Sequence, residues 1–141
     1  MKIFLDANIL VAVLNKEYPV YTYAARILSL ADNSRYKVYT SPLCLAIAFY
    51  FAEKKSGRTK AKEKISTLSS HIEIAGTDAD AVMQTINNKK INDFEDGLEY
   101  YSALAAKCGV IITEDTKDFY FSDIDVQSSL SFFERYLKPV R

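Results

Sequence analysis

Acidic side chains stand at three places in the sequence from which they can reach a common site. Asp6 follows one short apolar run, Asp115 and Asp118 follow another, and Asp93 and Asp96 open a helical segment. If the apolar runs are neighbouring parallel strands, these carboxylates converge where open α/β sheets bind ligands. Two unit charges ~4 Å apart repel by about 4 kcal/mol at an effective dielectric of about 20. Mg²⁺ or Mn²⁺ would relieve this repulsion and, by activating water, support phosphodiester cleavage.

A purely structural interpretation of the same acids stays open at this point. Asp6 precedes a helical segment and fits its N-cap, because Asp is a favoured capping residue. Asp93, Glu95 and Asp96 complement the positive end of a helix dipole, although that effect is typically below about 1 kcal/mol. Glu99 follows Asp96 by one helical turn and is expected near the same face.

Strands and helices are expected to alternate along the chain. The expected helices cover 8–14, 21–30, 43–55, 58–68, 79–86, about 91–107 and 130–137, and the expected strands 3–5, 36–40, 71–75, 110–112 and 124–127. Ser41-Pro42 predicts a helix start, Thr77 an N-cap and Gly109 a C-terminal cap. The alternation predicts one α/β domain over residues 1–141, with a parallel sheet, helices on both faces and right-handed crossovers.

Composition excludes some classes of protein. Lys+Arg and Asp+Glu both number 18, so any binding of nucleic acid must come from local basic patches. The strongest basic cluster covers residues 54–64 and is either a solvated surface or a phosphate-contacting face. Cys44 and Cys108 lie in apolar segments and are expected to be small buried residues, and His71 is not expected to be a ligand. No membrane span or signal peptide is expected, which predicts a cytoplasmic protein.

Three motifs in this order resemble the PIN domain, and most closely the VapC-like toxins of type II toxin–antitoxin modules. They are Asp-Ala-Asn at 6–8, Asp-Phe-Glu-Asp-Gly-Leu at 93–98 and Thr-Glu-Asp-Thr-Lys-Asp-Phe at 113–119. The resemblance implies a three-layer α/β/α sandwich with a mostly parallel central sheet. It also implies a Mg²⁺- or Mn²⁺-dependent endoribonuclease that pairs with an antitoxin and forms a homodimer. Apolar, aromatic stretches at 18–23 and 49–51 are candidates for such an interface, or for core packing.

The resemblance also implies roles for individual residues, carried over by position. The expected metal ligands are Asp6, Asp96 and Asp115, and with Asp118 they form the expected catalytic set. The supporting positions are Asn8, Asp93, Thr113 and Glu99. Lys89 and Lys90, just before the acidic helix, are the candidates for contact with the RNA backbone.

One departure from the family pattern bears on activity. The family usually places a glutamate mid-way along the helix expected at 43–55, which here falls near Ala46–Ala48, and all three residues are apolar. Glu53 lies roughly two turns too late, at ~3.6 residues per turn. Glu95 or Glu99 are the candidates to compensate. The alternative is a weakened or inactive PIN-like module that binds RNA or protein without cutting.

Overall fold

A five-stranded parallel sheet forms the centre of the molecule. The computed structural model describes residues 1–138. Its strands are β1 (Lys2–Leu5), β2 (Lys37–Thr40), β3 (Glu73–Ile74), β4 (Val110–Ile112) and β5 (Asp125–Gln127). They lie in the order β3-β2-β1-β4-β5, and every neighbouring pair is parallel. Ile3–Leu5 and all of β4 are buried, as expected of central strands covered on both faces.

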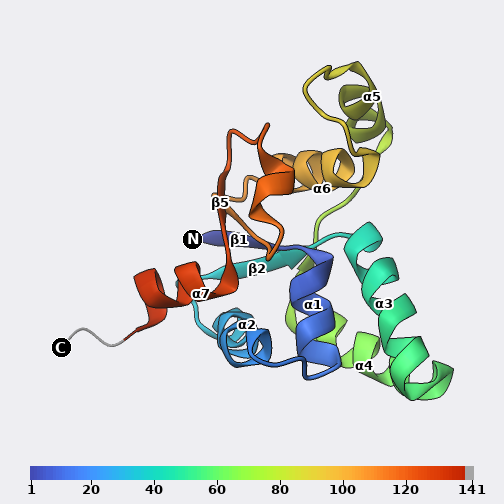
Figure 1. Ribbon diagram of the computed structural model, residues 1–141, viewed down its shortest axis with the longest axis vertical. Helices are drawn as coiled ribbons and strands as arrows, with labels where there is room; N and C mark the ends of the chain where they lie inside the picture. Colours follow the sequence, from blue (N-terminus) through green and yellow to red (C-terminus); the bar gives the residue numbers. More distant parts are fainter. Residues whose placement is uncertain (139–141) are drawn as a thin grey trace.

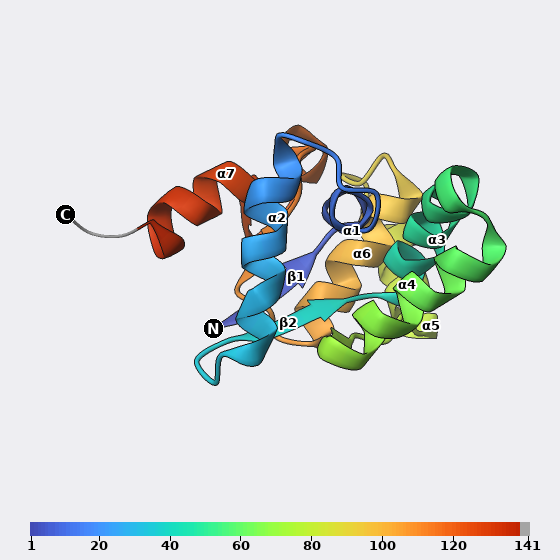
Figure 2. The ribbon, with the colours of Figure 1, turned by 90° about the horizontal axis from the view of Figure 1, so that it is seen from below.

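Helices cover both faces of this sheet. The segments that link β1, β2 and β3 contain α1 (Ala7–Leu14), α2 (Val20–Leu28), the 3₁₀ turn η1 (Ser29–Asp32), α3 (Pro42–Ser56) and α4 (Arg58–His71). The link from β3 to β4 contains α5 (Ala79–Asn87) and α6 (Phe94–Ala105). After β4 come the 3₁₀ turn η2 (Thr116–Phe119), β5, α7 (Ser129–Phe132) and the π-helical turn η3 (Phe133–Leu137). In Figure 1, α1 and α2 lie on one side of β1 and β2, and α5 and α6 lie on the other; in Figure 2, which is turned by 90°, α2 lies in front of these strands and α6 behind them. The predicted α/β/α sandwich is therefore confirmed.

The strand order reverses between β1 and β4, and this reversal positions the acidic residues. The chain first moves outwards from β1 to β3 and then crosses back to β4 on the other side of β1. Leu5 and Ile112 are partners in the β1–β4 register, and the Asp6 backbone N–H donates to the Ile112 carbonyl at 3.0 Å. Asp6 and Thr113 consequently leave the sheet side by side, at the kind of edge where α/β proteins bind ligands.

The end of α4 and the N-cap of α5 differ from the sequence-based expectation. His71 ends α4 instead of opening the third strand, which is only Glu73–Ile74. Asp78, and not Thr77, caps α5, because the Asp78 carboxylate accepts from the Ala81 backbone N–H at 3.0 Å. The Thr77 hydroxyl is instead hydrogen bonded to the hydroxyl of Ser102 on α6, at 2.7 Å.

The end of α6 also differs. The helix stops at Ala105, and Lys107 rather than Gly109 takes the left-handed backbone conformation, with a φ of 62°. Gly109 already extends the sheet, because its N–H donates to the Lys2 carbonyl at 2.9 Å. Both cysteines are buried and free of disulfides, as predicted. Among the described residues, no helix combines the length and the apolar character that a membrane crossing requires.

Candidate active site

Asp6 combines the two roles that the sequence left open. Its side chain caps α1, accepting from the Ala7 backbone N–H at 2.6 Å through Oδ1. Its other oxygen, Oδ2, accepts from the Thr113 hydroxyl at 2.7 Å. Only 7% of the residue is exposed, yet it lines a pocket. The capping bond therefore fixes the carboxylate without removing it from the candidate site.

Asn8 and Thr113 tie the start of α1 to the end of β4. The Asn8 amide lies 3.3 Å from Asp6 Oδ2, 3.0 Å from Thr113 Oγ1 and 3.2 Å from Asp115 Oδ2. The Asn8 carbonyl oxygen accepts from the Glu114 backbone N–H at 3.1 Å. Thr113 is fully buried, and its Oγ1 also accepts from the Asp115 backbone N–H at 3.1 Å. These bonds hold Asp6 and Asp115 in a fixed relation across two adjacent strands.

The start of α6 brings the remaining acids to the same edge. The Asp93 carboxylate caps the helix by accepting from the Asp96 backbone N–H at 3.1 Å. Asp96 and Glu99, three residues apart, both line the pocket. Gly97 lets α6 lie close against α5, because a Cβ at this position would come within 2.3 Å of Thr85 Cγ2. Close packing between these helices therefore sets where the acids of α6 lie.

The pocket at this edge is strongly acidic, with a volume of about 490 Å³. Eight of its 13 lining residues carry a carboxyl group, and none is basic. The lining residues are Asp6, Ala7, Asn8, Val11, Glu17, Ile47, Phe51, Asp93, Glu95, Asp96, Glu99, Asp115 and Asp118. All four aspartates predicted as catalytic therefore line one pocket, but among the described residues the predicted ligands Asp96 and Asp115 do not join Asp6 in a group of potential ligand atoms within 4.8 Å of one another.

Two predicted positions lie apart from this lining. Lys89 and Lys90 are exposed in the loop before α6, and the Lys90 carbonyl accepts from the Tyr120 hydroxyl. The basic residues of 54–64 lie on α3 and α4 and are also outside the lining. The structure therefore separates the basic groups from the carboxylates, so a polyanion would meet them outside the acidic pocket.

Burial and neighbouring carboxylates raise the pKa of two acids on α6. Burial, followed by the charges of Asp93, Asp6, Asp118 and Glu95, raises the pKa of Asp96 to about 7. For Glu99, burial and then its interaction with Asp6 raise the pKa to about 10. In the protein without a bound cation, Glu99 is therefore protonated at neutral pH and Asp96 is partly protonated.

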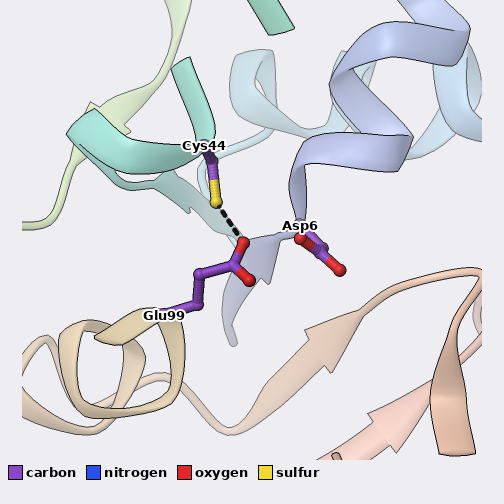
Figure 3. Close-up of side chains that lie close together, drawn as sticks. All are labelled: Asp6, Cys44 and Glu99. Carbon is purple, nitrogen blue, oxygen red and sulfur yellow. Dashed lines mark hydrogen bonds between the residues drawn. The ribbon is translucent and has the colours of Figure 1, made fainter. Parts of the chain in front are cut away.

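Within the pocket, Asp6, Glu99 and Cys44 form the tightest group. One potential ligand atom from each residue lies within 4.8 Å of the other two. Figure 3 shows the Glu99 carboxyl, from α6, reaching towards Cys44 on α3 and towards Asp6 at the end of β1. The Cys44 thiol donates to Glu99 Oε1 at 2.6 Å, and burial raises the pKa of that thiol above its ordinary value.

This donor set fits a hard divalent cation. Carboxylate oxygens are the ligands that Mg²⁺ and Mn²⁺ prefer. Potential ligand atoms of Asp6 and Glu99 lie within 4.8 Å of each other, so both carboxyl groups could hold the same ion. A cation would also neutralise the repulsion that raises the pKa of Asp96 and Glu99. The thiol of Cys44 is the one donor in the tight group that suits a softer metal.

Glu17, Cys44 and Ile47 are among the site residues that the sequence-based interpretation missed. Cys44 was interpreted as core packing, and it is buried, but its thiol faces a carboxyl group. Ile47 is the member of the Ala46–Ala48 segment that lines the pocket, while Ala48 is fully buried. The available signal was the helix start: the Ser41 hydroxyl accepts from the Cys44 N–H at 3.2 Å, which places 44 and 47 one turn apart on one face.

Comparison with known proteins supports this assignment of fold. The model of the PIN domain family matches residues 2–117. Ribonuclease VapC1 from Aquifex aeolicus (strain VF5) is 24% identical over 139 residues, covering 96% of this chain and 95% of that protein.

Solved structures agree with the family match. A structure of VapBC-1 from nontypeable Haemophilus influenzae aligns with a TM-score of 0.71 and 20% identity, covering 92% of this chain and 99% of the other. Mycobacterium tuberculosis VapC20, described as a sarcin–ricin loop cleaving toxin, aligns with a TM-score of 0.65 and 18% identity, covering 87% and 98%. At these identities the structural likeness concerns the fold.

Proposed function

This chain belongs to the PIN domain family, and from that premise we propose that it is a metal-dependent endoribonuclease, the toxin of a toxin–antitoxin module. The observation that carries the proposal is the acidic pocket at the switch point of the sheet. Its eight carboxyl groups have no basic neighbour in the lining. Ionised carboxylates in such a pocket repel one another unless a cation binds between them. Cations held by carboxylates commonly support phosphodiester hydrolysis.

The groups proposed to hold the cation are Asp6, Asp96 and Asp115. They come from three different elements and line one pocket. When bound there, Mg²⁺ or Mn²⁺ supplies an activated water and stabilises the charge that develops on the phosphoryl group. The chain's own contribution is to hold Asp6 and Asp115 in a fixed relation, because the Asn8 amide donates to both carboxylates.

Each supporting residue has a definable task in this proposal. Thr113 and Asn8 donate to the carboxylate of Asp6, which fixes its orientation. Asn8 also donates to Asp115 and so fixes the distance between two proposed ligands. Asp93 anchors the backbone of Asp96. Asp118 lies at the exposed side of the pocket, where its carboxylate can accept a proton from a water.

We assign the substrate as RNA. An RNA backbone is repelled by the free carboxylates, so binding requires cations near the rim. Lys89 and Lys90 are exposed on the loop that leads into α6 and meet this need. The curated relative from Aquifex aeolicus is a ribonuclease by name, which supports the choice of substrate.

The proposal includes two protein partners. An antitoxin is expected because the VapBC-1 structure of Haemophilus influenzae shares this fold over most of both chains. A homodimer is expected because large apolar side chains are exposed: Tyr18 by 70%, Tyr50 by 53% and Phe51 by 44%. Because RNA cleavage by a toxin takes place inside the cell, cytoplasmic localisation belongs to the same proposal.

RNA cleavage by purified protein tests the proposal. Wild type, Asp6→Asn and Asp96→Asn are compared with Mn²⁺, with Mg²⁺ and with EDTA. The control is Asp80→Asn, an exposed aspartate on α5 outside the pocket lining. We expect cleavage by wild type and the control only when metal is present, and a loss of at least about a hundredfold in the two pocket variants. Equal cleavage by all four proteins, or cleavage in EDTA, contradicts the assignment.

A further inference from the structure

Glu99 is a carboxylic acid in a place where a carboxylic acid is difficult to accommodate. The residue is 3% exposed and lies in the second turn of α6. No basic side chain lines its pocket. The only ion pair among the described residues joins Arg58 to Glu53, at the far end of α3. Glu99 therefore has no cationic partner among residues 1–138, although burying a charge without one is costly.

The direction of the side chain points to a shared ligand. In Figure 3 the Glu99 carboxyl lies beside both Asp6 and Cys44. Potential ligand atoms of all three residues fall within 4.8 Å of one another. The Cys44 thiol donates to Oε1 and so fixes the carboxyl at this point. Two buried carboxylates a few ångströms apart repel each other, and a divalent cation between them would remove this repulsion.

Ile47 gives this arrangement its second, independent support. It lines the same pocket from α3. An apolar side chain there supplies no ligand. The pocket therefore lacks a carboxylate on α3 and has an additional, deeply buried one on α6.

We infer that Glu99 is a ligand of the bound cation and supplies from α6 the carboxylate that α3 lacks. This inference rests on the proposed function, because it concerns the cation of the same pocket. Cys44 acts as a positioning residue: its thiol donates to the Glu99 carboxyl in the metal-free protein and keeps the side chain turned towards Asp6. The proposed ligand therefore comes from α6 and not from α3, and both helices line the site.

Calorimetric titration with MnCl₂ at pH 7.5 tests the inference without relying on activity. Glu99→Gln removes the ionisable carboxyl group with little change of shape, and Asp80→Asn makes the same chemical change at an exposed position on α5, outside the pocket lining. Ile47→Glu/Glu99→Gln returns a carboxylate to α3. Circular dichroism and thermal unfolding in EDTA check the fold of each protein, and the rise in Tm on adding Mn²⁺ gives a second measure of binding.

The inference predicts a defined order of affinities. Removing groups that only support a ligand already costs about 10–100-fold in metal affinity, so Glu99→Gln should bind Mn²⁺ at least about tenfold more weakly. Asp80→Asn should stay within about twofold, because exposed charges outside the pocket contribute little. The double variant should recover most of the loss.

Each contrary result has a separate meaning. If folded Glu99→Gln binds Mn²⁺ as tightly as wild type, the inference is overturned while the proposed function stands. If wild type binds no Mn²⁺ at millimolar concentration, both are overturned. If Glu99→Gln does not fold, Glu99→Asp replaces it, since it withdraws the carboxylate by one methylene group. The same loss is then expected, and wild-type affinity overturns the inference.

Discussion

The hydroxyl of Thr113 gives the sharpest structural prediction. It is fully buried, donates to Asp6 Oδ2 at 2.7 Å, and accepts from Asn8 and from the Asp115 backbone. Thr113→Val keeps the shape of the side chain and removes all of these bonds. Asn8 and Asp115 are partly or fully exposed and can bond to water instead. The loss that counts is therefore the bond to the buried carboxylate of Asp6.

The magnitude follows from that single bond. A hydrogen bond to a charged group contributes about 1.5–3 kcal/mol, so we expect the free energy of unfolding to fall by about 2 kcal/mol. For a chain of this length each kcal/mol lowers Tm by roughly 3–4 °C, which gives a decrease of about 7 °C. Thr113→Ser keeps the hydroxyl and loses one buried methyl group, at a cost of about 1 kcal/mol.

A double-mutant cycle provides the decisive assay. Urea unfolding is measured for wild type, Thr113→Val, Asp6→Asn and the double variant, all in EDTA. The bond predicts a coupling energy of about 1–2 kcal/mol between the two positions. RNA cleavage should fall in Thr113→Val and stay close to wild type in Thr113→Ser. Additive unfolding free energies, or equal cleavage by Thr113→Val, would refute the claim that Thr113 positions Asp6.

Three further predictions concern the electrostatics, the packing and the rim of the site. The pKa of Asp96 is raised to about 7, so between about pH 4 and 7 the folded protein binds more protons than the unfolded chain. The Tm measured in EDTA should therefore fall as the pH rises from about 4 to 7. Mn²⁺ should raise Tm more at pH 7.5 than at pH 5.5. A Tm in EDTA that does not depend on pH, and that Asp96→Asn leaves unchanged, contradicts the role given to Asp96. Gly97→Ala should lower the free energy of unfolding by about 1–3 kcal/mol through the clash with Thr85; Thr85→Ser should recover part of it, and an undiminished stability contradicts the packing argument. Replacing both Lys89 and Lys90 with Gln should weaken RNA binding and reduce its salt dependence by about 0.7 per lost phosphate contact, measured by fluorescence anisotropy, whereas an unchanged slope removes them from the interface.

The convergence of the acids could be predicted from the sequence because it depends on strand order. An apolar run followed by Asp6 and a second one followed by Thr113 and Asp115 need only be adjacent and parallel to bring these groups together. The start of α6 then lies at the same edge, because a helix runs back along the strand that follows it. These relations are topological, so they tolerate errors of one or two residues in the element boundaries.

The assignments that failed depend on contacts between distant segments. Thr77 was expected to cap α5, but its hydroxyl is engaged with Ser102, and Asp78 replaces it as the cap. Likewise, Cys44 could be placed on a buried helix face, but its contact with Glu99 depends on how α3 packs against α6. No local pattern in either helix specifies that packing.

A crystal soaked in MnCl₂ tests the central claim most directly, because the anomalous signal locates the ion without reference to activity. The account predicts one peak inside the acidic pocket, about 2.0–2.3 Å from a carboxylate oxygen of Asp6 and within coordination distance of acids from α6. No peak in the pocket at millimolar Mn²⁺, or an ion bound elsewhere while Asp6 contacts only protein atoms, would contradict it.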